Sequence, residues 1–349
     1  MRIIFIPDYR DKNSYQTNLS SSLSKQDIQV YFGGRVMKSI LEHRPDILHI
    51  HWTYPFLVAK SRLGTVAKSI KFMCELSLLR LFGIKIIWTV HNIVDHEGRF
   101  KSTELFFNKL LIRLCNKLIV HCPSAKVEIT EIYGKDDSSI VVIPHGNYIG
   151  LYDNTITSAD ARDILHLNAE DKVFLYFGQI RPYKGIPELI DAFKRLNSKQ
   201  CKLLIVGKPL NDEIAADIQN SCIDNGNIRN ILKFVPDDDI QIYMNVADVV
   251  VLPFKDILTS GSAILSMSFG KSIIVPMYGC MSDTLDNKGS FLFSKTEEDG
   301  LFKTMQHVLS TDRAILEDMG KHNLALAEKF SWSKIAEKTY DIYQECLLK

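Results

Sequence analysis

The sequence lacks the motifs by which many α/β proteins bind nucleotides. No GxGxxG follows the first apolar stretch, where "FIPDYRDKNS" at 5–14 contains no glycine, and no GxxxxGK[ST] occurs. The first motif lets a strand-to-helix turn approach a pyrophosphate, and the second wraps backbone N–H groups around phosphates. Their absence argues against a typical nicotinamide dehydrogenase and against a P-loop NTPase.

Long hydrophobic runs and regularly spaced cysteines are also missing. No apolar run approaches the roughly 18 residues of a membrane span, and the N-terminal "MRIIFIPDYR" has the wrong length and flanks for a signal peptide. The seven cysteines form no CxxC pair, which argues against a disulfide framework and for a reducing compartment. We therefore expect a cytoplasmic protein.

What the sequence does contain is a repeated alternation of apolar runs and helical patterns. The runs are rich in Ile and Val and apolar throughout, as expected of strands covered on both faces of a parallel sheet. They lie at 2–7, 28–32, 46–52, 85–92, 117–122 and 139–146, and again at 172–178, 202–207, 231–235, 248–254, 272–276 and 290–293. The alternation predicts an α/β protein with two doubly wound, Rossmann-like domains.

The polar segment 146–163 predicts the boundary between the domains, which we place at 1–150 and 151–330. The last helical pattern, at 331–347, has no strand after it. We expect residues 331–349 to form a helix that packs back on the first domain.

The two halves differ in charge although the whole chain carries a formal net charge of only +1. Residues 1–150 hold 20 Lys and Arg against 13 Asp and Glu, and the remainder holds 22 against 28. A basic half and an acidic half predict different partners, and we expect no nucleic acid among them. The basic amphipathic segments 59–85 and 99–117 are either ordinary surface helices or a docking face for an anionic membrane, such as the inner membrane.

The second predicted domain opens with a cationic turn, "FGQIRPYKG" at 177–185. Open α/β sheets bind ligands beyond the carboxyl ends of their strands, and Arg181 and Lys184 follow such an end. A guanidinium fork beside an ammonium point charge suits a diphosphate. The alternative is a pair of solvated surface cations.

A second candidate anion site lies in "DILTSGSAILSMSFGK" at 256–271. Its small residues, 259–262, follow an apolar strand and open a helix, whose first N–H groups and dipole attract anions. No carboxylate follows Asp256 in this stretch, and the alternative is a plain capped helix. Because both loops end strands of one predicted sheet, we expect them to converge on one anionic ligand.

A run of three aspartates at 237–239, in "KFVPDDDI", follows another strand of the same sheet. Such a run resembles a metal site, but Asp before a helix usually caps it. We expect a cap and no metal.

Three histidines of the first domain stand at predicted strand ends: His51, His91 and His145. Since His49 alternates with His51, we expect one of that pair to face inward as a structural residue. A loop histidine held by hydrogen bonds is the plain alternative to a functional role for His91.

The loop after His91 adds titratable groups at Asp95, His96 and Glu97. Such a cluster can orient a hydroxyl or remove its proton. A zinc site built from His91 and His96 is an alternative.

In their order along the chain, these segments resemble the GT-B glycosyltransferases, particularly glycosyltransferase family 4 (group 1). The similar segments are "TVHN", "VIPHGNY", "FGQIRPYKG", "VPDDDIQIYMNVADVVVLPF" and "SFGKSIIVP". The resemblance spans most of residues 40–345. It implies an acceptor-binding N-terminal domain, a donor-binding C-terminal domain and a cleft between them.

The resemblance implies transfer of a sugar from a nucleotide diphosphate, GDP- or UDP-linked and foremost GDP-mannose, to a saccharide or lipid-linked oligosaccharide. Arg181 and Lys184 would stabilise the departing diphosphate, and His91 would contact the donor sugar or the acceptor. His51 and Trp52 are candidates for the acceptor side. Donor contacts are expected from Gly178, Gln179, Val235, Pro236, Thr259, Ser260, Gly261, Ser262 and His145. No cofactor or metal is implied, since the nucleotide sugar is a substrate and fixed cations stand in for a metal.

Two departures from the family pattern matter. Gln179 stands where the family has an arginine after the loop glycine, and the two family glutamates fall at Leu258 and Leu265. The chain is similar in this respect to a subgroup with "TSGS"-like donor loops that includes bacterial exopolysaccharide mannosyltransferases. An inverting reaction would need a base, for which Asp95 and Glu97 are candidates.

We therefore expect an enzyme of bacterial surface polysaccharide synthesis, cytoplasmic or peripheral on the cytoplasmic membrane face. The alternatives are a GT-B sugar-nucleotide epimerase and a two-lobed nucleotide-sugar-binding protein without catalysis.

Overall fold

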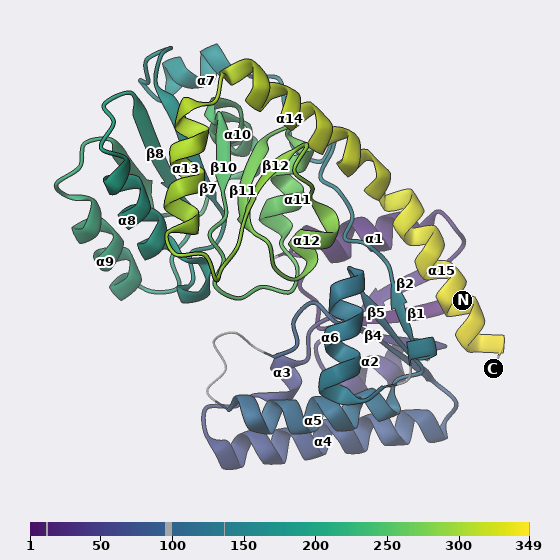
Figure 1. Cartoon of the computed structure of the whole chain (residues 1–349). Coiled ribbons are helices and arrows are strands. Elements are labelled where there is room, and N and C mark those ends of the chain that lie inside the picture. The colour runs from purple at the N-terminus through teal and green to yellow at the C-terminus, as the bar shows by residue number, and fades with distance from the viewer. Residues whose placement is uncertain (12, 95–99, 136, 349) are drawn as a thin grey trace. The chain divides into compact units, whose positions relative to one another are not determined.

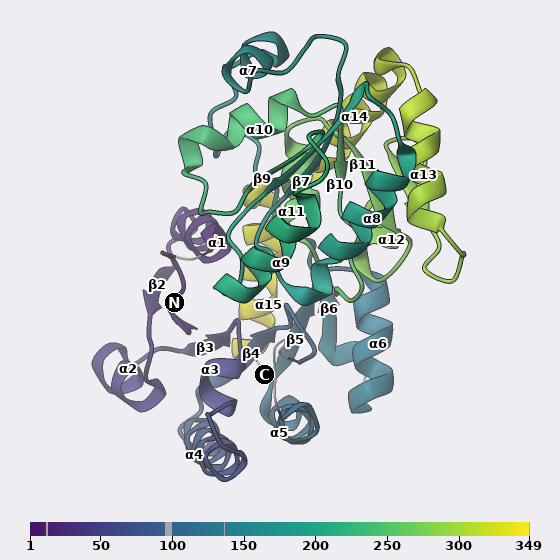
Figure 2. The ribbon, with the colours of Figure 1, turned by 90° about the vertical axis from the view of Figure 1, so that its left-hand side faces the viewer.

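The computed structural model describes residues 1–11, 13–94, 100–135 and 137–348, which form two compact units (Figures 1 and 2). One unit comprises Met1–Gly146 together with Phe330–Lys349, and the other comprises Asn147–Lys329. The chain therefore passes between the units twice, at 146–147 and again at 329–330.

The first unit is built on a six-stranded parallel sheet with the order β2-β1-β3-β4-β5-β6. Its strands are β1 (Arg2–Ile6), β2 (Gln29–Phe32), β3 (Ile47–Ile50), β4 (Lys85–Thr89), β5 (Lys117–Val120) and β6 (Ile140–Val142). All six coincide with predicted apolar runs. The sheet is covered on both faces, so residues at odd and even positions of its inner strands are equally buried.

Helices cover both faces of this sheet. Helices α1 (Ser14–Ser24) and α15 (Trp332–Leu348) pack against each other over one face, where Ile3, Phe5, Ile87 and Trp332 share a core. The C-terminal helix thus belongs to the first unit. The other helices are α2 (Val36–His43), α3 (Tyr54–Leu57), α4 (Arg62–Leu81), α5 (Lys101–Leu114) and α6 (Pro123–Tyr133). Helices α4 and α5 lie side by side (Figure 1).

The second unit repeats the plan with the strand order β12-β11-β10-β7-β8-β9, again all parallel. Its strands are β7 (Lys172–Phe177), β8 (Cys201–Val206), β9 (Ile228–Ile231), β10 (Val249–Val251), β11 (Ser272–Pro276) and β12 (Ser290–Phe293). The prediction of a strand at 231–235 is wrong. The edge strand β9 ends where its neighbour β8 ends, with Ile231 opposite Val206, so the apolar residues beyond have no strand to pair with.

Two layers of helices enclose this second sheet. Helices α8 (Ile186–Leu196), α9 (Asp212–Cys222) and α13 (Gly300–Ser310) pack together, and so do the pairs α7 (Ser158–Ile164) with α10 (Ile240–Val246) and α11 (Gly261–Ser268) with α14 (Arg313–Ala327). A short helix, α12 (Cys280–Thr284), links β11 to β12. The two parallel sheets, each covered by helices, confirm the predicted doubly wound α/β fold.

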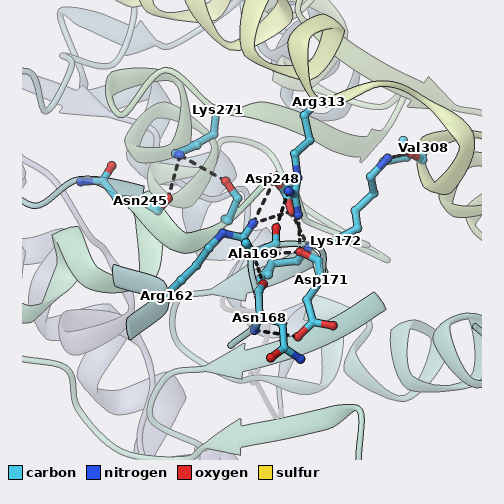
Figure 3. A network of polar contacts seen from close by, with 12 residues as sticks. Arg162, Asn168, Ala169, Asp171, Lys172, Asn245, Asp248, Lys271, Val308 and Arg313 are labelled. Atoms are coloured by element: carbon cyan, nitrogen blue, oxygen red, sulfur yellow. Dashed lines mark hydrogen bonds and ion pairs between the residues drawn. The ribbon is translucent and has the colours of Figure 1, made fainter. Parts of the chain in front are cut away.

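A buried polar network holds the amino end of the second sheet (Figure 3). The carboxylate of Asp248, directly before β10, accepts hydrogen bonds from Arg162 at 3.0 and 3.2 Å and from the backbone N–H of Val173 at 2.6 Å. Arg313 of α14 completes the cluster at 3.0 Å. The side chains of Arg162 and Asp248 are only 9% and 10% exposed. One carboxylate therefore neutralises cations from two helices.

Two lysines extend the network without direct contact to Asp248. Lys271 donates to the carbonyl oxygen of Ala247 at 3.2 Å, and Lys172 donates to the carbonyl oxygens of Val308, Leu309 and Thr311. Burial lowers the pKa of Lys271 to about 8, while the nearby Asp248 acts in the opposite direction.

Among the helices that the structure describes, none is long and apolar enough to cross a membrane.

Candidate active site

The loop after β7 meets the first turn of α11 at the carboxyl end of the second sheet. Gly178 has a φ of +139°, and a Cβ atom there would lie 2.5 Å from the hydroxyl oxygen of Ser262. Only glycine tolerates both the backbone conformation and this approach. Since β7 and β10 are neighbours, the structure brings together the two loops that the sequence suggested as anion sites.

Arg181 and Lys184 lie in the loop that follows Gly178. Arg181 donates to the carbonyl oxygens of Ile180 and Lys208, at 2.9 and 3.4 Å. Lys184 ends the short 3-10 turn η2 (Pro182–Lys184). The next residue, Gly185, has a φ of +75°. A Cβ atom on Gly185 would lie only 2.0 Å from the carbonyl oxygen of Pro253, so this position requires glycine. The turn is therefore fixed against the segment after β10.

Lys184 is a buried cation in aromatic surroundings. Its ammonium group lies 4.3 Å from the ring centre of Phe254 and 5.1 Å from that of Tyr183. Burial, with a further contribution from Arg181, lowers its pKa to about 7. In the part of the chain that the structure describes, no carboxylate forms an ion pair with Lys184. The site can therefore take a proton and an anion together.

Helix α11 adds backbone donors at the same end of the sheet. Its N-cap residue Ser260 accepts a hydrogen bond from the N–H of Ala263 at 3.2 Å. Within the described residues, the N–H groups of Gly261 and Ser262 have no acceptor, and both residues are partly exposed. First-turn N–H groups of a helix bind anions. Ser260 thus caps the helix while the N–H groups of Gly261 and Ser262 can still bind an anion. A capped helix and an anion site are therefore compatible here.

The remaining predicted donor residues surround this end of the sheet. Gln179 follows Gly178 directly, and its carbonyl oxygen accepts from the Tyr176 hydroxyl at 2.8 Å. Thr259 is partly exposed next to Ser260, whereas Val235 is buried and Pro236 exposed in the segment after β9. No described contact connects Val235 or Pro236 to the Arg181 loop.

Leu258 and Leu265, the positions of the two family glutamates, are 5% and 7% exposed. Both therefore serve packing and offer nothing to a ligand.

The predicted aspartate cap at 237–239 is wrong: all three side chains are exposed, and Asp239, at the N-cap of α10, makes no capping hydrogen bond. Its helical backbone conformation, unlike the extended one of a typical N-cap, directs the side chain away from the first turn.

The first unit presents a different constellation, in which a histidine follows each of four adjacent strands. These are His51 after β3, His91 after β4, His121 after β5 and His145 after β6. All four are buried, and the ring of Tyr15 from α1 contacts each of them, with ring centres 4.8 to 5.7 Å apart. Sequence reasoning missed His121 and Tyr15. Parallel strands end at one edge, so the strand-end position of His121 was the available signal.

Three of these histidines form a directed hydrogen-bond chain. His121 donates from Nδ1 to the carbonyl oxygen of Ile143 at 2.9 Å, so its Nε2 is free to accept from Nδ1 of His91 at 3.2 Å. Nε2 of His91 in turn accepts from Nδ1 of His51 at 3.4 Å. These tautomers follow from the network. The chain ends at Nε2 of His51, which is buried and has no partner among the described residues.

Burial keeps the cluster neutral. It lowers the pKa of His121 to about 3 and that of His145 to about 4, and it also lowers the pKa values of His51 and His91, with neighbouring histidines adding to the effect. A neutral imidazole is both a donor and an acceptor. This edge can therefore bind uncharged hydroxyl groups without bringing a charge of its own.

His91 is both bonded and stacked. The indole of Trp52 lies parallel to its ring, with ring centres 4.5 Å apart and planes at 15°. His51 and Trp52 line a small cavity with room for about one water molecule. The bond from His51 to His91, at 3.4 Å, is the longest in the chain and the easiest for a hydroxyl to replace.

The expectation that one of His49 and His51 faces inward as a structural residue holds for His49, and His51 is buried as well. Residues two apart in a strand point to the same face. His49 is held on both nitrogens, by the Tyr343 hydroxyl at 2.6 Å and the Thr89 hydroxyl at 2.7 Å, and it stacks on His51.

The other candidates of this loop, Asp95, His96 and Glu97, lie outside the described residues. Within the described part of the chain, no group of three or more His, Cys, Asp or Glu side chains is placed to hold a metal ion.

Comparison with known families agrees with the division of the chain into two units. Residues 14–147 match the model of Glycosyltransferase Family 4, and residues 158–323 match that of Glycosyl transferases group 1. One similar protein is a GDP-mannose:glycolipid 4-beta-D-mannosyltransferase of Xanthomonas campestris pv. campestris, 25% identical over 97% of this chain and 89% of that protein. Another is a D-inositol 3-phosphate glycosyltransferase of Nocardia farcinica, 24% identical over 68% of this chain and 54% of that protein.

Solved structures share the fold at lower identity. Sucrose-phosphate synthase from Thermosynechococcus elongatus has a TM-score of 0.78 at 16% identity, covering 99% of this chain and 98% of that one. Anabaena HepE in complex with UDP and glucose has a TM-score of 0.77 at 16% identity, covering 99% of this chain and all of that one. With both of its units matched, the chain belongs to the family 4 (group 1) glycosyltransferases and is a glycosyltransferase of the GT-B fold.

Proposed function

We propose that this glycosyltransferase transfers a sugar, foremost mannose, from a nucleotide diphosphate to a saccharide or lipid-linked oligosaccharide in surface polysaccharide synthesis. The observation that carries the donor class is the junction of the Arg181–Lys184 turn with the first turn of α11, through Gly178 and Ser262. It presents two cations and free N–H groups with no carboxylate paired to Lys184 among the described residues, which suits a diphosphate.

On this proposal the second unit stabilises the leaving group. Negative charge grows on the diphosphate as the bond to the sugar breaks, and preorganised donors lower the barrier most where charge develops. Arg181 and Lys184 supply charge, and the N–H groups of Gly261 and Ser262 supply fixed dipoles. No metal is required for this step in the proposal, because these groups serve the diphosphate directly.

The sugar and acceptor assignments rest on the Xanthomonas relative, whose name gives GDP-mannose as donor and a glycolipid as acceptor. UDP and glucose are bound in the HepE structure, so UDP-sugars are the second candidates. Because buried leucines occupy the positions of the family glutamates, the sugar would be recognised by backbone, hydroxyl groups or side chains of the first unit.

We assign acceptor recognition to the buried histidines at the carboxyl end of the first sheet. There His91, His51 and Trp52 would contact hydroxyl groups. His145 remains a proposed donor contact. If the reaction inverts the anomeric carbon, a base must remove the proton of the acceptor hydroxyl. Asp95 and Glu97 are the proposed candidates for that role.

Thermal shift over a panel of GDP- and UDP-sugars tests the donor class, because a ligand that binds the native state raises its melting temperature. We expect the largest shift with GDP-mannose and transfer of mannose to a lipid-linked saccharide. Release of GDP with the acceptor present, detected by coupled assay, reports turnover.

Arg181→Ala and Lys184→Ala should each weaken donor binding by about 10- to 100-fold, the range of one charge-assisted hydrogen bond. Lys194→Ala is the matched control, since Lys194 is an exposed cation in the last turn of α8, the helix that follows the Arg181–Lys184 turn. If both site variants bind donors as the wild type does, the diphosphate assignment is wrong.

A further inference from the structure

Helix α4 exposes an apolar stripe along its whole length, in addition to the apolar face that it buries. Leu63 and Leu81 are each 84% exposed, Ile70 is 51% exposed, and Phe82, the C-cap residue, is 73% exposed. Ala67 and Cys74 continue the stripe between them and are also exposed. Single exposed leucines are ordinary on protein surfaces, but a continuous line of them marks an interaction surface.

The stripe runs opposite the packed face of the helix. The buried residues Thr65, Ser69, Phe72, Leu76 and Leu79 share one side. At about 100° per residue, Leu63, Ile70 and Leu81 cluster roughly 180° away from that side. The helix therefore needs none of these exposed side chains for its own packing.

Cations flank the stripe on both sides. Arg62 and Arg80 lie along one border, and Lys68 and Lys71 along the other, by the same helical count. The carboxylate of Glu75 lies 3.9 Å from the Lys71 ammonium, but that lysine side chain is still 76% exposed.

The neighbouring helix α5 continues this surface. Phe106 is 59% exposed, and Lys109 and Arg113 are exposed on the same side of α5. Together α4 and α5 carry seven Lys and Arg against two Glu, and one of these, Glu104, is buried. We call this surface, made by the exposed residues of the two helices, the α4–α5 face.

We infer that the α4–α5 face docks on an anionic lipid bilayer, with α4 lying in the plane of the membrane. An amphipathic helix with large apolar side chains between basic residues binds the boundary between headgroups and acyl chains. The basic flanks attract anionic lipids. A second copy of this chain is disfavoured as the partner, because it would bring the same positive charge to the contact. The inference stands independently of the proposed donor and acceptor.

Vesicle flotation tests the inference with the full chain. Vesicles of equimolar phosphatidylglycerol and phosphatidylcholine should carry the protein upward, pure phosphatidylcholine vesicles should not, and added salt should reduce binding. Leu63→Gln/Leu81→Gln should lower the partition coefficient at least about tenfold, since Gln keeps the size and helix propensity of Leu but not its apolar surface. Lys71→Gln/Lys109→Gln should lower it by about fivefold for each cation removed.

Leu41→Gln/Ile223→Gln is the matched control, since Leu41 and Ile223 are 73% and 78% exposed but lie on α2 and at the end of α9. This control should float as the wild type does, and all three variants should keep the wild-type melting temperature. Equal flotation of the α4 variant and the control, or no dependence on phosphatidylglycerol, would overturn the inference. So would a dimer in light scattering that Leu63→Gln/Leu81→Gln converts to a monomer.

Discussion

The carboxyl ends of the two six-stranded sheets hold opposite kinds of chemistry. In the first unit, four strands end in buried histidines that burial keeps neutral. In the second, Arg181 and Lys184 stand beside a helix N-terminus, and among the described residues no carboxylate pairs with Lys184. The same fold thus offers one edge for uncharged hydroxyl groups and one for an anion. The fold supplies the place, and the loop residues supply the chemistry.

Acid should destabilise the first unit, because its four strand-end histidines are buried in the neutral form. This is the largest expected effect. Each buried histidine has a folded-state pKa below its unfolded value of about 6.5, so the unfolded chain binds more protons between the two values. Stability is complete above pH 6.5 and falls below it by about 1.4 kcal/mol per pH unit for each such histidine.

Tryptophan fluorescence measures this effect selectively, since all three tryptophans, Trp52, Trp88 and Trp332, belong to the first unit. Denaturant titrations should show a steep loss of stability from pH 7 to pH 5, and His121→Asn should make it less steep. A flat profile in this range would mean that the histidines are not held neutral.

Removing the carboxylate at the amino end of the second sheet should have the next largest effect. Asp248→Asn leaves Arg162 and Arg313 without their counterion, and breaking a buried ion pair from one side costs about 3–5 kcal/mol. Chemical denaturation followed by circular dichroism should show this loss. Asp191→Asn is the control, because Asp191 is 73% exposed and 3.9 Å from Arg195; it should leave stability nearly unchanged. The donor affinity of folded Asp248→Asn should equal that of the wild type.

Lys184→Met should show the opposite behaviour at the carboxyl end. Methionine fills the same space without a charge, so the free energy of unfolding should stay the same or increase, while donor affinity should fall by about 1.5–3 kcal/mol. Calorimetric titration with GDP-mannose and with GDP measures the affinity. A variant that loses stability without losing affinity would assign Lys184 to packing.

Proton uptake is the smallest effect and the most specific. With a pKa of about 7, Lys184 is largely neutral at pH 8, and a bound diphosphate should raise that pKa. Nucleotide binding should therefore take up as much as one proton. Titrations in Tris and in HEPES, which differ in ionisation enthalpy, measure the uptake, and Lys184→Met should abolish it. Equal binding enthalpies in both buffers would contradict the assignment.

Much of the fold follows from the sequence because both sheets are buried on both faces. Apolar runs such as 172–178 and 272–276 leave little room for another interpretation. The exception is 231–235, which is as apolar as a strand but extends past the end of β8. A strand at the sheet edge needs a partner of matching length, and the local sequence does not contain that information.

The donor-side candidates could be proposed from strand ends and helix starts, because those features are local. The histidine cluster could be proposed only in part, since its hydrogen bonds join residues as far apart as His49 and Tyr343. The lowered pKa of Lys184 was also out of reach, because it depends on Phe254 and Pro253 packing over the loop. Burial of side chains distant in sequence decides both cases.

The first unit is discontinuous along the chain, and this sets an order of events during synthesis. Its core includes Trp332, Ile335 and Tyr343 of α15, a helix that leaves the ribosome only after the whole of the second unit. Residues 147–329 are translated in full before that helix exists, and domains fold as units while the chain emerges. The second unit can therefore complete its folding first, while the earlier-made first unit waits, with its α1 face uncovered, until α15 has been synthesised.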